Sequence, residues 1–259
     1  MNQRLDFRFS IPPRPEGPLV ELSSDEIEKM LLKRLAESSA DPTQALWNLA
    51  QFYKVSKQHE KALERLRQLI DRLPDPEHKA ECVLTMGQAM EQVGDYPTAV
   101  RYYKEALALE PTKTFTWYFT NNNLGFCLNT LGRFSDGEVY CRKALEIDPN
   151  RPNAHKNLGI ALAGVGSYED AARCFIAATQ ANAADPRAFG LLQDLLKQHP
   201  ELEFEFQEAL DCCQKAVELA ARKNAELRPK VHRGWRKQLI LLKARLRNLF
   251  RRKVERETA

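Results

Sequence analysis

The chain has 259 residues, of which 43% are hydrophobic and 29% are charged, and its formal net charge is +4. No apolar run approaches the roughly eighteen residues that a membrane-spanning helix needs, so this composition predicts a soluble globular protein. The opening residues 1–6 lack the apolar stretch of a secretory signal, and we therefore expect a cytoplasmic protein. The six cysteines form no CxxC pair and have no histidines at metal-binding spacing, so we expect neither a disulfide framework nor a metal site.

Charge is distributed unevenly along the chain. Residues 222–259 contain fourteen Lys and Arg against three Asp and Glu, a net charge of +11, whereas residues 1–221 carry −7. An acidic body followed by a basic tail is an asymmetry that needs its own explanation.

The N-terminal part begins with residues 1–22, which are rich in proline and are predicted to form an extended arm without helix. The next residues, Ser24-Asp25-Glu26, are of the types that begin helices. Four apolar residues follow at helical spacing and would line one face of a helix over residues 23–40: Ile27, Met30, Leu31 and Leu35. We expect this helix to cap the first of the repeats that come next.

Three later segments share one pattern. Residues 94–99, 132–137 and 166–171 each contain a glycine, an aromatic residue two positions later, and a small residue three positions after that. A second glycine precedes each segment by seven residues, with apolar residues at helical spacing between the two. The pattern predicts helical hairpins, because a glycine can end the first helix in a left-handed conformation and small residues let two helices approach closely. A hairpin of this size cannot bury its apolar face alone, so the copies should stack.

These residues resemble the tetratricopeptide repeat family, whose unit is a helix–turn–helix of about 34 residues. The matching positions put four repeats in residues 43–186, with a weaker first copy and starts near Thr43, Ala80, Tyr118 and Pro152. Two of the links between repeats then carry three or four extra residues. The resemblance implies an all-α fold, a right-handed α-solenoid of stacked helix–turn–helix hairpins with N- and C-terminal capping helices.

Residues 187–221 are predicted to form a fifth, degenerate hairpin. Its first helix carries Phe189 and Leu192, and its second carries Ala209, Cys213 and Ala216 at the family's small–medium–small spacing. The turn between the two helices, residues 199–201, lacks the glycine pattern.

The resemblance implies that the first helix of each hairpin lines a concave inner surface, and the residues expected there are rich in neutral amides. Asn48, Asn123 and Asn157 occupy the same repeat position in three of four copies, and Thr85 takes that position in the remaining one. An amide can pair with both the N–H and the C=O of an extended backbone. The arrangement is similar to the asparagine ladder of the tetratricopeptide region in O-linked N-acetylglucosamine transferases. The alternative is that these amides are tolerated on a solvated helix face or bind water between helices.

Two aromatic residues are predicted to anchor a partner in the same peptide-binding groove. Phe119 and Phe126 lie seven residues apart, about two turns along one side of a helix. With Asn122 and Asn123 between them they would form an apolar pocket rimmed by amides, a composition typical of an anchor site. The other inner positions include Lys54, Gln88 and Glu91, and the further polar binding residues are Asn153 and Lys156. The neighbouring aromatic residues are expected to pack the enlarged link into the core: Phe115, Trp117 and Tyr118.

Residues 222–259 are predicted to form a basic amphipathic helix. Its apolar stripe contains Leu239, Leu242, Leu246 and Leu249, and its basic surface contains Arg236, Lys237, Lys243, Arg247, Arg251 and Arg252. We favour the interpretation that this helix is a cap whose apolar stripe covers the last hairpin. Two alternative interpretations are that the helix contacts an anionic membrane surface or that it contacts nucleic-acid phosphates.

The sequence contains no recognisable catalytic motif. It has no glycine-rich phosphate loop, no HExxH and no nucleophile elbow, and its five histidines are scattered. We therefore predict no enzyme activity and no cofactor. We predict instead a protein–protein interaction scaffold or adaptor that binds an extended peptide segment of a partner in the concave groove. The alternative is a peripheral membrane or nucleic-acid tether that acts through the basic C-terminal helix. A third hypothesis is a homo-oligomer in which the arm around Leu5, Phe7, Phe9 and Ile11 lies in a neighbour's groove.

Overall fold

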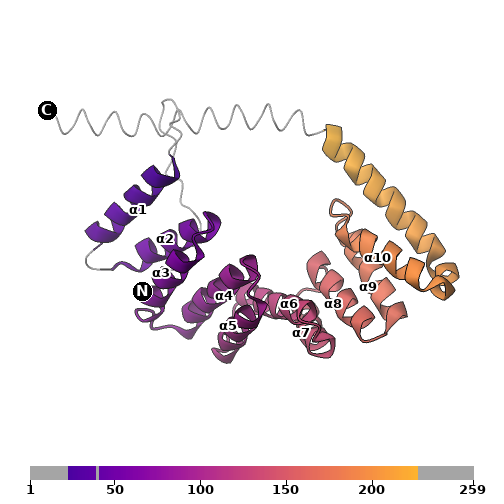
Figure 1. Cartoon of the computed structure of the whole chain (residues 1–259), viewed down its shortest axis with the longest axis horizontal. Helices are drawn as coiled ribbons and strands as arrows, with labels where there is room; N and C mark the ends of the chain where they lie inside the picture. The colour runs from indigo at the N-terminus through magenta and orange to yellow at the C-terminus, as the bar shows by residue number, and fades with distance from the viewer. Residues whose placement is uncertain (1–22, 39–40, 227–259) are drawn as a thin grey trace. The chain divides into compact units, whose positions relative to one another are not determined.

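The computed structural model describes residues 23–38 and 41–226, and all regular structure in these ranges is helical (Figure 1). The chain divides into two compact units, of which the first comprises Met1–Ala45 and Lys223–Ala259 and the second Leu46–Arg222. The predicted arm over residues 1–22 and the basic tail beyond residue 226 lie outside the described residues.

Within the described ranges the helices form consecutive pairs. Four hairpins are α2 with α3, α4 with α5, α6 with α7 and α8 with α9, and α10 begins a fifth. This confirms the all-α solenoid of stacked hairpins. The bounds are α1 (Ser24–Glu37), α2 (Thr43–Val55), α3 (His59–Ile70), α4 (Pro76–Gln92), α5 (Tyr96–Ala108), α6 (Thr114–Thr130), α7 (Phe134–Ile147), α8 (Pro152–Gly164), α9 (Tyr168–Ala181), α10 (Arg187–Gln198), the short 3-10 turn η1 (Pro200–Leu202) and a last helix over residues 203–226.

Helix α1 starts with a reciprocal pair of hydrogen bonds. The Ser23 hydroxyl accepts from the Glu26 N–H, and the Glu26 carboxylate accepts from the Ser23 N–H at 2.7 Å. Two donors that would otherwise be unpaired at a helix start are thereby satisfied. These bonds explain why a helix begins here, and its role as a cap of the first repeat stays a prediction.

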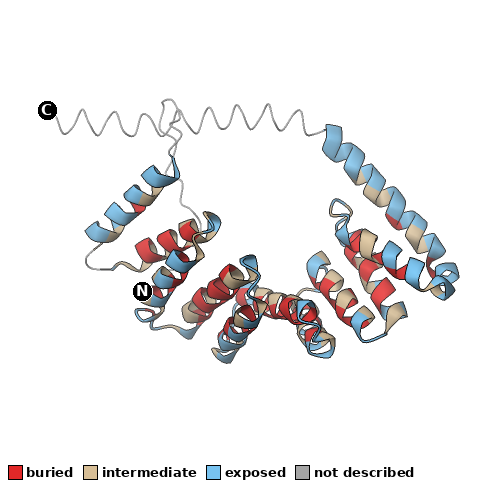
Figure 2. Cartoon of the chain, in the orientation of Figure 1, coloured by how far each residue is buried: buried red, intermediate tan, exposed pale blue. Residues whose placement is uncertain are grey.

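In the second unit each hairpin packs on the next. The first helices contact one another, α4 with α6 and α6 with α8, and each second helix contacts the following first helix. Helices α4 and α6 lie on the hollow side of this array, with α5 and α7 on the opposite side (Figure 1). Buried residues gather where helices face one another (Figure 2), and Ala99, Tyr103 and Ala106 of α5 are fully buried. A leucine that is fully buried, such as Leu66 or Leu124, contributes about 1.5–3 kcal/mol relative to an exposed one.

The third hairpin brings two glycines into its helix–helix contact. A Cβ on Gly125 of α6 would lie 2.5 Å from the Cys141 Sγ and 3.1 Å from the Gly137 carbonyl oxygen, both on α7. These distances are shorter than ordinary van der Waals contact, so a side chain at this position would push α6 and α7 apart.

The extra residues between repeats lengthen helices rather than loops. Helices α4 and α6 have 17 residues each, whereas α2 and α8 have 13. Helices α2 and α8 begin at the expected starts, Thr43 and Pro152, but α4 and α6 begin four residues before Ala80 and Tyr118. For α4 the physical reason is local, because the Asp75 carboxylate caps the helix and Pro76 fits its first turn.

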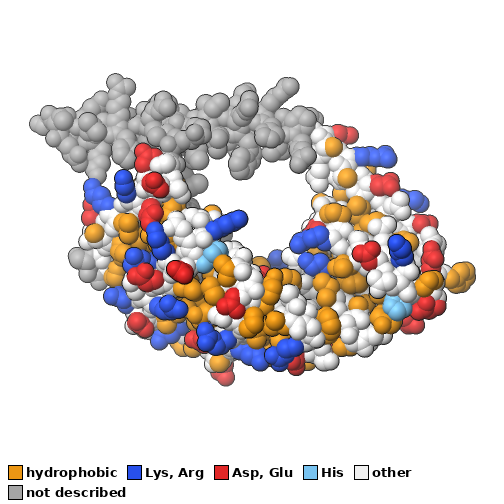
Figure 3. Space-filling model, in the orientation of Figure 1, with side chains coloured by type: hydrophobic (Ala, Val, Ile, Leu, Met, Phe, Trp, Pro, Cys, Tyr) orange, Lys and Arg blue, Asp and Glu red, His pale blue; other side chains and the backbone are white. Residues whose placement is uncertain are grey.

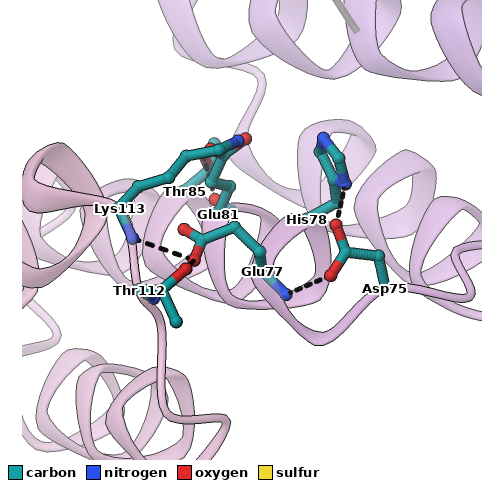
Figure 4. A network of polar contacts seen from close by, with 7 residues as sticks. All are labelled: Asp75, Glu77, His78, Glu81, Thr85, Thr112 and Lys113. Atoms are coloured by element: carbon teal, nitrogen blue, oxygen red, sulfur yellow. Dashed lines mark hydrogen bonds and ion pairs between the residues drawn. The ribbon is translucent and has the colours of Figure 1, made fainter. Parts of the chain in front are cut away.

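The added turn of α4 carries Glu77, whose buried carboxylate holds the link between α5 and α6 (Figure 4). Its Oε2 accepts from the Thr112 N–H at 2.6 Å, from the Thr112 hydroxyl at 3.0 Å and from the Lys113 N–H at 3.0 Å. Beside it, the Asp75 carboxylate accepts from the Glu77 N–H at 3.0 Å and pairs with His78 at 2.6 Å. Burial alone would raise the pKa of Glu77, but the Lys113 and Thr112 donors outweigh burial and lower this pKa.

The turn inside each hairpin contains one residue with a left-handed backbone. This residue is Gly94 (φ 81°), Gly132 (φ 73°) and Gly166 (φ 86°) in the second to fourth hairpins, but Lys57 (φ 60°) in the first. A residue with a Cβ is less stable than glycine in this conformation by about 1–2 kcal/mol.

We expect Lys57→Gly to raise the free energy of unfolding by about 0.5 kcal/mol, because relief of strain exceeds the entropy that glycine adds to the unfolded chain. The matched reverse change is Gly94→Lys, which introduces the same backbone strain. A Cβ at residue 94 meets no atom within 4 Å, so no steric clash is added. This variant should lower the free energy of unfolding by about 1 kcal/mol. Urea denaturation measures both. Shifts of the same sign would contradict the assignment of strain to this turn position.

The fifth hairpin closes against α9 without a turn glycine. The Tyr168 ring of α9 stacks on His199, with centroids 3.6 Å apart, and η1 follows directly. Phe206 of the last helix is buried in a cluster with Phe175 and Leu192. The helix described over residues 203–226 continues past Ala221, where the sequence predicted an end.

Candidate functional site

The predicted groove residues lie on α2, α4, α6 and α8. In the space-filling view, the second unit is hollowed on this side and apolar side chains gather over its middle (Figure 3). We define the inner face as the surface around five partly exposed side chains: Glu91 of α4, Phe119, Asn123 and Phe126 of α6, and Ile160 of α8.

Three of the predicted amides bind one another. The Asn157 side chain donates to Asn122 Oδ1 at 3.1 Å, and the Asn122 side chain donates to Asn123 Oδ1 at 3.1 Å. Asn129, on the last turn of α6, donates to the Asn157 carbonyl oxygen at 2.7 Å. A chain of amide hydrogen bonds therefore joins α6 to α8.

The three amides that were expected as equivalent rungs differ in exposure. Asn157 is only 3% exposed and bonded to Asn122, which is itself 7% exposed, whereas Asn48 and Asn123 are half-buried. In the free chain, the Asn157 side chain is therefore not exposed to bind a partner's backbone. It is buried against α6 and already hydrogen-bonded to Asn122. The ladder itself stays a prediction.

Three aromatic residues of α6 lie along one side of the helix: Phe115, Phe119 and Phe126. Phe119 packs on Phe115 and Tyr118, with ring centroids 4.5 and 5.0 Å away, and Phe126 meets Tyr96 edge-on at 6.1 Å. Tyr118 is buried as expected, but Phe115 is 62% exposed. The expectation that Phe115 fills the core was wrong, because the extra turn of α6 carries it clear of the neighbouring hairpin.

A carboxylate and a phenol lie near the other end of the amide chain. The Tyr103 hydroxyl donates to Glu91 Oε2 at 2.6 Å, and the Asn123 side chain lies close enough to this hydroxyl to act on its pKa. Burial raises the pKa of Glu91, and the Tyr103 donor opposes this effect. Burial, followed by the charge of Glu91, raises the pKa of Tyr103.

These polar side chains extend from α4 through α5 and α6 to α8 and were not foreseen as a group. The sequence placed Glu91 on the inner surface without a role. The sequence does show an acidic residue, Glu91, twelve positions before Tyr103. This spacing alone does not predict a bond, because only the packing of α5 on α4 brings the two side chains together.

The remaining predicted groove residues belong to a different place. Asn153 and Lys156 line a notch between α8, α9 and the start of α10, together with Asn182 and Asp185. Burial, and then the charge of Arg187, lower the pKa of Lys156, while Asp185 raises it. The Asp185 carboxylate binds the Arg187 guanidinium, with contacts that include 2.8 and 3.0 Å, and this holds the Asp185 pKa at about 2. The one carboxylate that lines the notch is thus paired with Arg187.

Several predictions concern other parts of the chain. The predicted basic surface lies outside the described residues: Arg236, Lys237, Lys243, Arg247, Arg251 and Arg252. In residues 23–38 and 41–226, no group of His, Cys, Asp and Glu is placed to hold a metal ion. None of the helices described there is long and apolar enough to cross a bilayer.

Comparison with known proteins points to one repeat family. Family models for the tetratricopeptide repeat match residues 42–110 and 128–195. Human tetratricopeptide repeat protein 7B is 32% identical over 100 residues, which are 39% of this chain and 11% of the human protein. The photosystem I assembly protein Ycf3 of Prochlorococcus marinus is 33% identical over 88 residues, which are 34% of this chain and 50% of Ycf3. The matched region thus spans at most half the length of these relatives.

Solved structures share the fold at low sequence identity. BtubC from P. vanneervenii superposes with a TM-score of 0.60 at 19% identity, covering 79% of this chain and 89% of BtubC. MamA from Desulfovibrio magneticus RS-1 gives 0.55 at 17% identity, with 73% and 98% covered. YrrB, described as having an unusual peptide-binding site, gives 0.55 at 20% identity, with 76% and 99% covered. At these identities the likeness concerns the fold alone.

Proposed function

The chain belongs to the tetratricopeptide repeat family, whose members are in general non-catalytic protein-interaction scaffolds, and from this premise we propose that it is an adaptor that holds an extended segment of another protein against the inner face. Residues of α4 and α6 would make the contact. The partner's backbone would bind Asn123, and one of its apolar side chains would pack on Phe119 or Phe126.

The observation that carries this proposal is the state of Asn123. Its Oδ1 accepts one hydrogen bond from Asn122, and its amide group lies close enough to the Tyr103 hydroxyl to act on the pKa of that group. An asparagine side chain offers two lone pairs and two N–H groups, so one acceptor and one donor stay available. These are the two groups that a peptide unit of an extended backbone requires.

The neighbours of Asn123 favour binding because they fix it in place before a partner arrives. The hydrogen bond from Asn122 and the half-buried position of Asn123 restrict its side chain, so less rotamer entropy is lost on binding. Phe119 lies one helical turn before Asn123 and Phe126 one turn after it, and both rings are half-buried. The amide is thus flanked by two apolar surfaces, the usual composition of a peptide-binding groove.

The test starts from random twelve-residue peptides displayed on phage and selected on the immobilised full-length protein. We expect Asn123→Ala to weaken the selected peptides about five- to tenfold, because one donor and one acceptor are lost. Fluorescence anisotropy measures the dissociation constants, and circular dichroism checks that the variant is folded.

Asn150→Ala is the matched control, because Asn150 is exposed in the turn between α7 and α8. It should leave the affinity unchanged. Asn157→Ala is unsuitable, since it removes the donor to the buried Asn122 oxygen and would lower stability as well. Equal affinity of the wild type, Asn123→Ala and Phe126→Ala would refute the proposal.

A further inference from the structure

We propose that the inner face selects partner segments that carry a lysine or arginine side chain, and that the Glu91 carboxylate binds this cation. The inference rests on the proposed function and adds the chemistry of the partner to it. It is carried by the geometry and the charge balance around Glu91.

Glu91 is held at the edge of the inner face. It is half-buried one residue before the end of α4, and the 2.6 Å hydrogen bond from the Tyr103 hydroxyl fixes one of its oxygens. Tyr103 belongs to a buried cluster that includes Cys127 of α6, and Phe119 and Phe126 pack against this cluster. The Tyr103 hydroxyl therefore holds the carboxylate beside the cluster on which the two phenylalanines of the inner face pack.

No cation of the described chain compensates this carboxylate. Glu91 forms no ion pair within residues 23–38 and 41–226, and the group that binds it there is the Tyr103 hydroxyl. Glu81, nearly three turns earlier on α4, is paired with Lys113 at 2.7 Å. A partly desolvated carboxylate without a counter-charge is unfavourable, and a cationic ligand would relieve this cost.

The surroundings of Glu91 suit a long basic side chain. Tyr96 follows Glu91 across the turn and meets Phe126 edge-on, and both rings pack against the cluster that contains Tyr103. The aliphatic stem of lysine or arginine packs on such rings while its charged end reaches an acceptor. The site thus offers a ring surface for the stem and an oxygen for the head.

Two lysines that could attract an acidic partner lie elsewhere. Lys54 is on α2 and donates to Gln88 at 3.1 Å, and Lys156 lines the separate notch between α8, α9 and α10. Among the five side chains that define the inner face, Glu91 is the charged one, which favours a basic segment over an acidic one.

The test repeats the random-peptide selection in parallel on wild-type protein and on Glu91→Gln. Glutamine keeps an oxygen for the Tyr103 hydroxyl and removes only the charge, so the fold is expected to persist; circular dichroism verifies this. We expect a Lys and Arg excess of about threefold or more in the wild-type pool and none in the Glu91→Gln pool. A single selected peptide should bind Glu91→Gln about tenfold more weakly, with a smaller dependence on NaCl concentration.

Glu105→Gln is the matched control, since Glu105 is exposed on α5 and the charge change is the same. It should behave like the wild type. Peptides that are enriched without Lys or Arg, or with Asp and Glu in their place, would overturn the inference and leave the proposed function standing. A wild-type selection that yields no peptide above the bare support would refute the proposed function and this inference with it.

Discussion

Replacing Gly125 by alanine should lower the free energy of unfolding by about 1–2 kcal/mol, although alanine is the better helix former. The new Cβ would lie 2.5 Å from the Cys141 Sγ and 3.1 Å from the Gly137 carbonyl oxygen. The thiol can rotate away, but the carbonyl belongs to the backbone of α7 and moves only with that helix. Overpacking of this kind costs about 1–3 kcal/mol and exceeds the propensity gain of about 1 kcal/mol.

Gly190→Ala is the matched control. Gly190 lies within α10, and a Cβ there meets no atom within 4 Å. The same substitution should therefore raise stability by about 0.5–1 kcal/mol. Urea denaturation followed by circular dichroism compares the two variants. If Gly125→Ala were as stable as Gly190→Ala, the close approach of α6 and α7 would not be a stability determinant.

The second large effect is expected at Glu77. Glu77→Gln removes the negative charge of the carboxylate that accepts hydrogen bonds from the Thr112 and Lys113 N–H groups. This change should lower the free energy of unfolding by about 1–3 kcal/mol at neutral pH. Because the pKa of Glu77 is lowered in the folded chain, its stabilising effect is present above the unfolded value near 4.5 and is lost as the pH falls through the folded value.

The comparison should therefore be made at two pH values. The stability gap between wild type and Glu77→Gln is expected to be largest at pH 7 and to shrink below about pH 4, because protonation then removes the charge from the wild type as well. Glu105→Gln, exposed on α5, should stay within about 0.5 kcal/mol of the wild type at pH 7. A gap at Glu77 that is the same at pH 7 and pH 3 would show that the carboxylate charge does not hold the link.

The hairpins were predictable because their signals are local. The glycine at residues 94, 132 and 166 sets the turn by its own backbone conformation, and a positive φ at each was found. The early starts of α4 and α6 were missed, since the repeat pattern fixes where helices face one another and says little about their first turn. Asp75 and Pro76 were the visible cue for α4.

The candidate site was less predictable than the fold. A shared repeat position does not imply a shared environment: Asn157 meets Asn122 because α8 packs on α6, whereas Thr85 at the same position bonds its own helix at the Glu81 carbonyl. The Glu91–Tyr103 bond likewise depends on the register of α5 against α4. Contacts between helices of different repeats are set by packing, which a single repeat's sequence does not encode.

The hydrogen bonds between repeats bear on how the array comes apart. In a linear stack where each repeat touches only its neighbours, the ends fray and opening spreads inward one hairpin at a time. Here Asn157 donates to Asn122, and Asn129 donates to the Asn157 carbonyl oxygen, so buried hydrogen bonds join the third and fourth repeats. We expect these two repeats to open together and later than the outer hairpins.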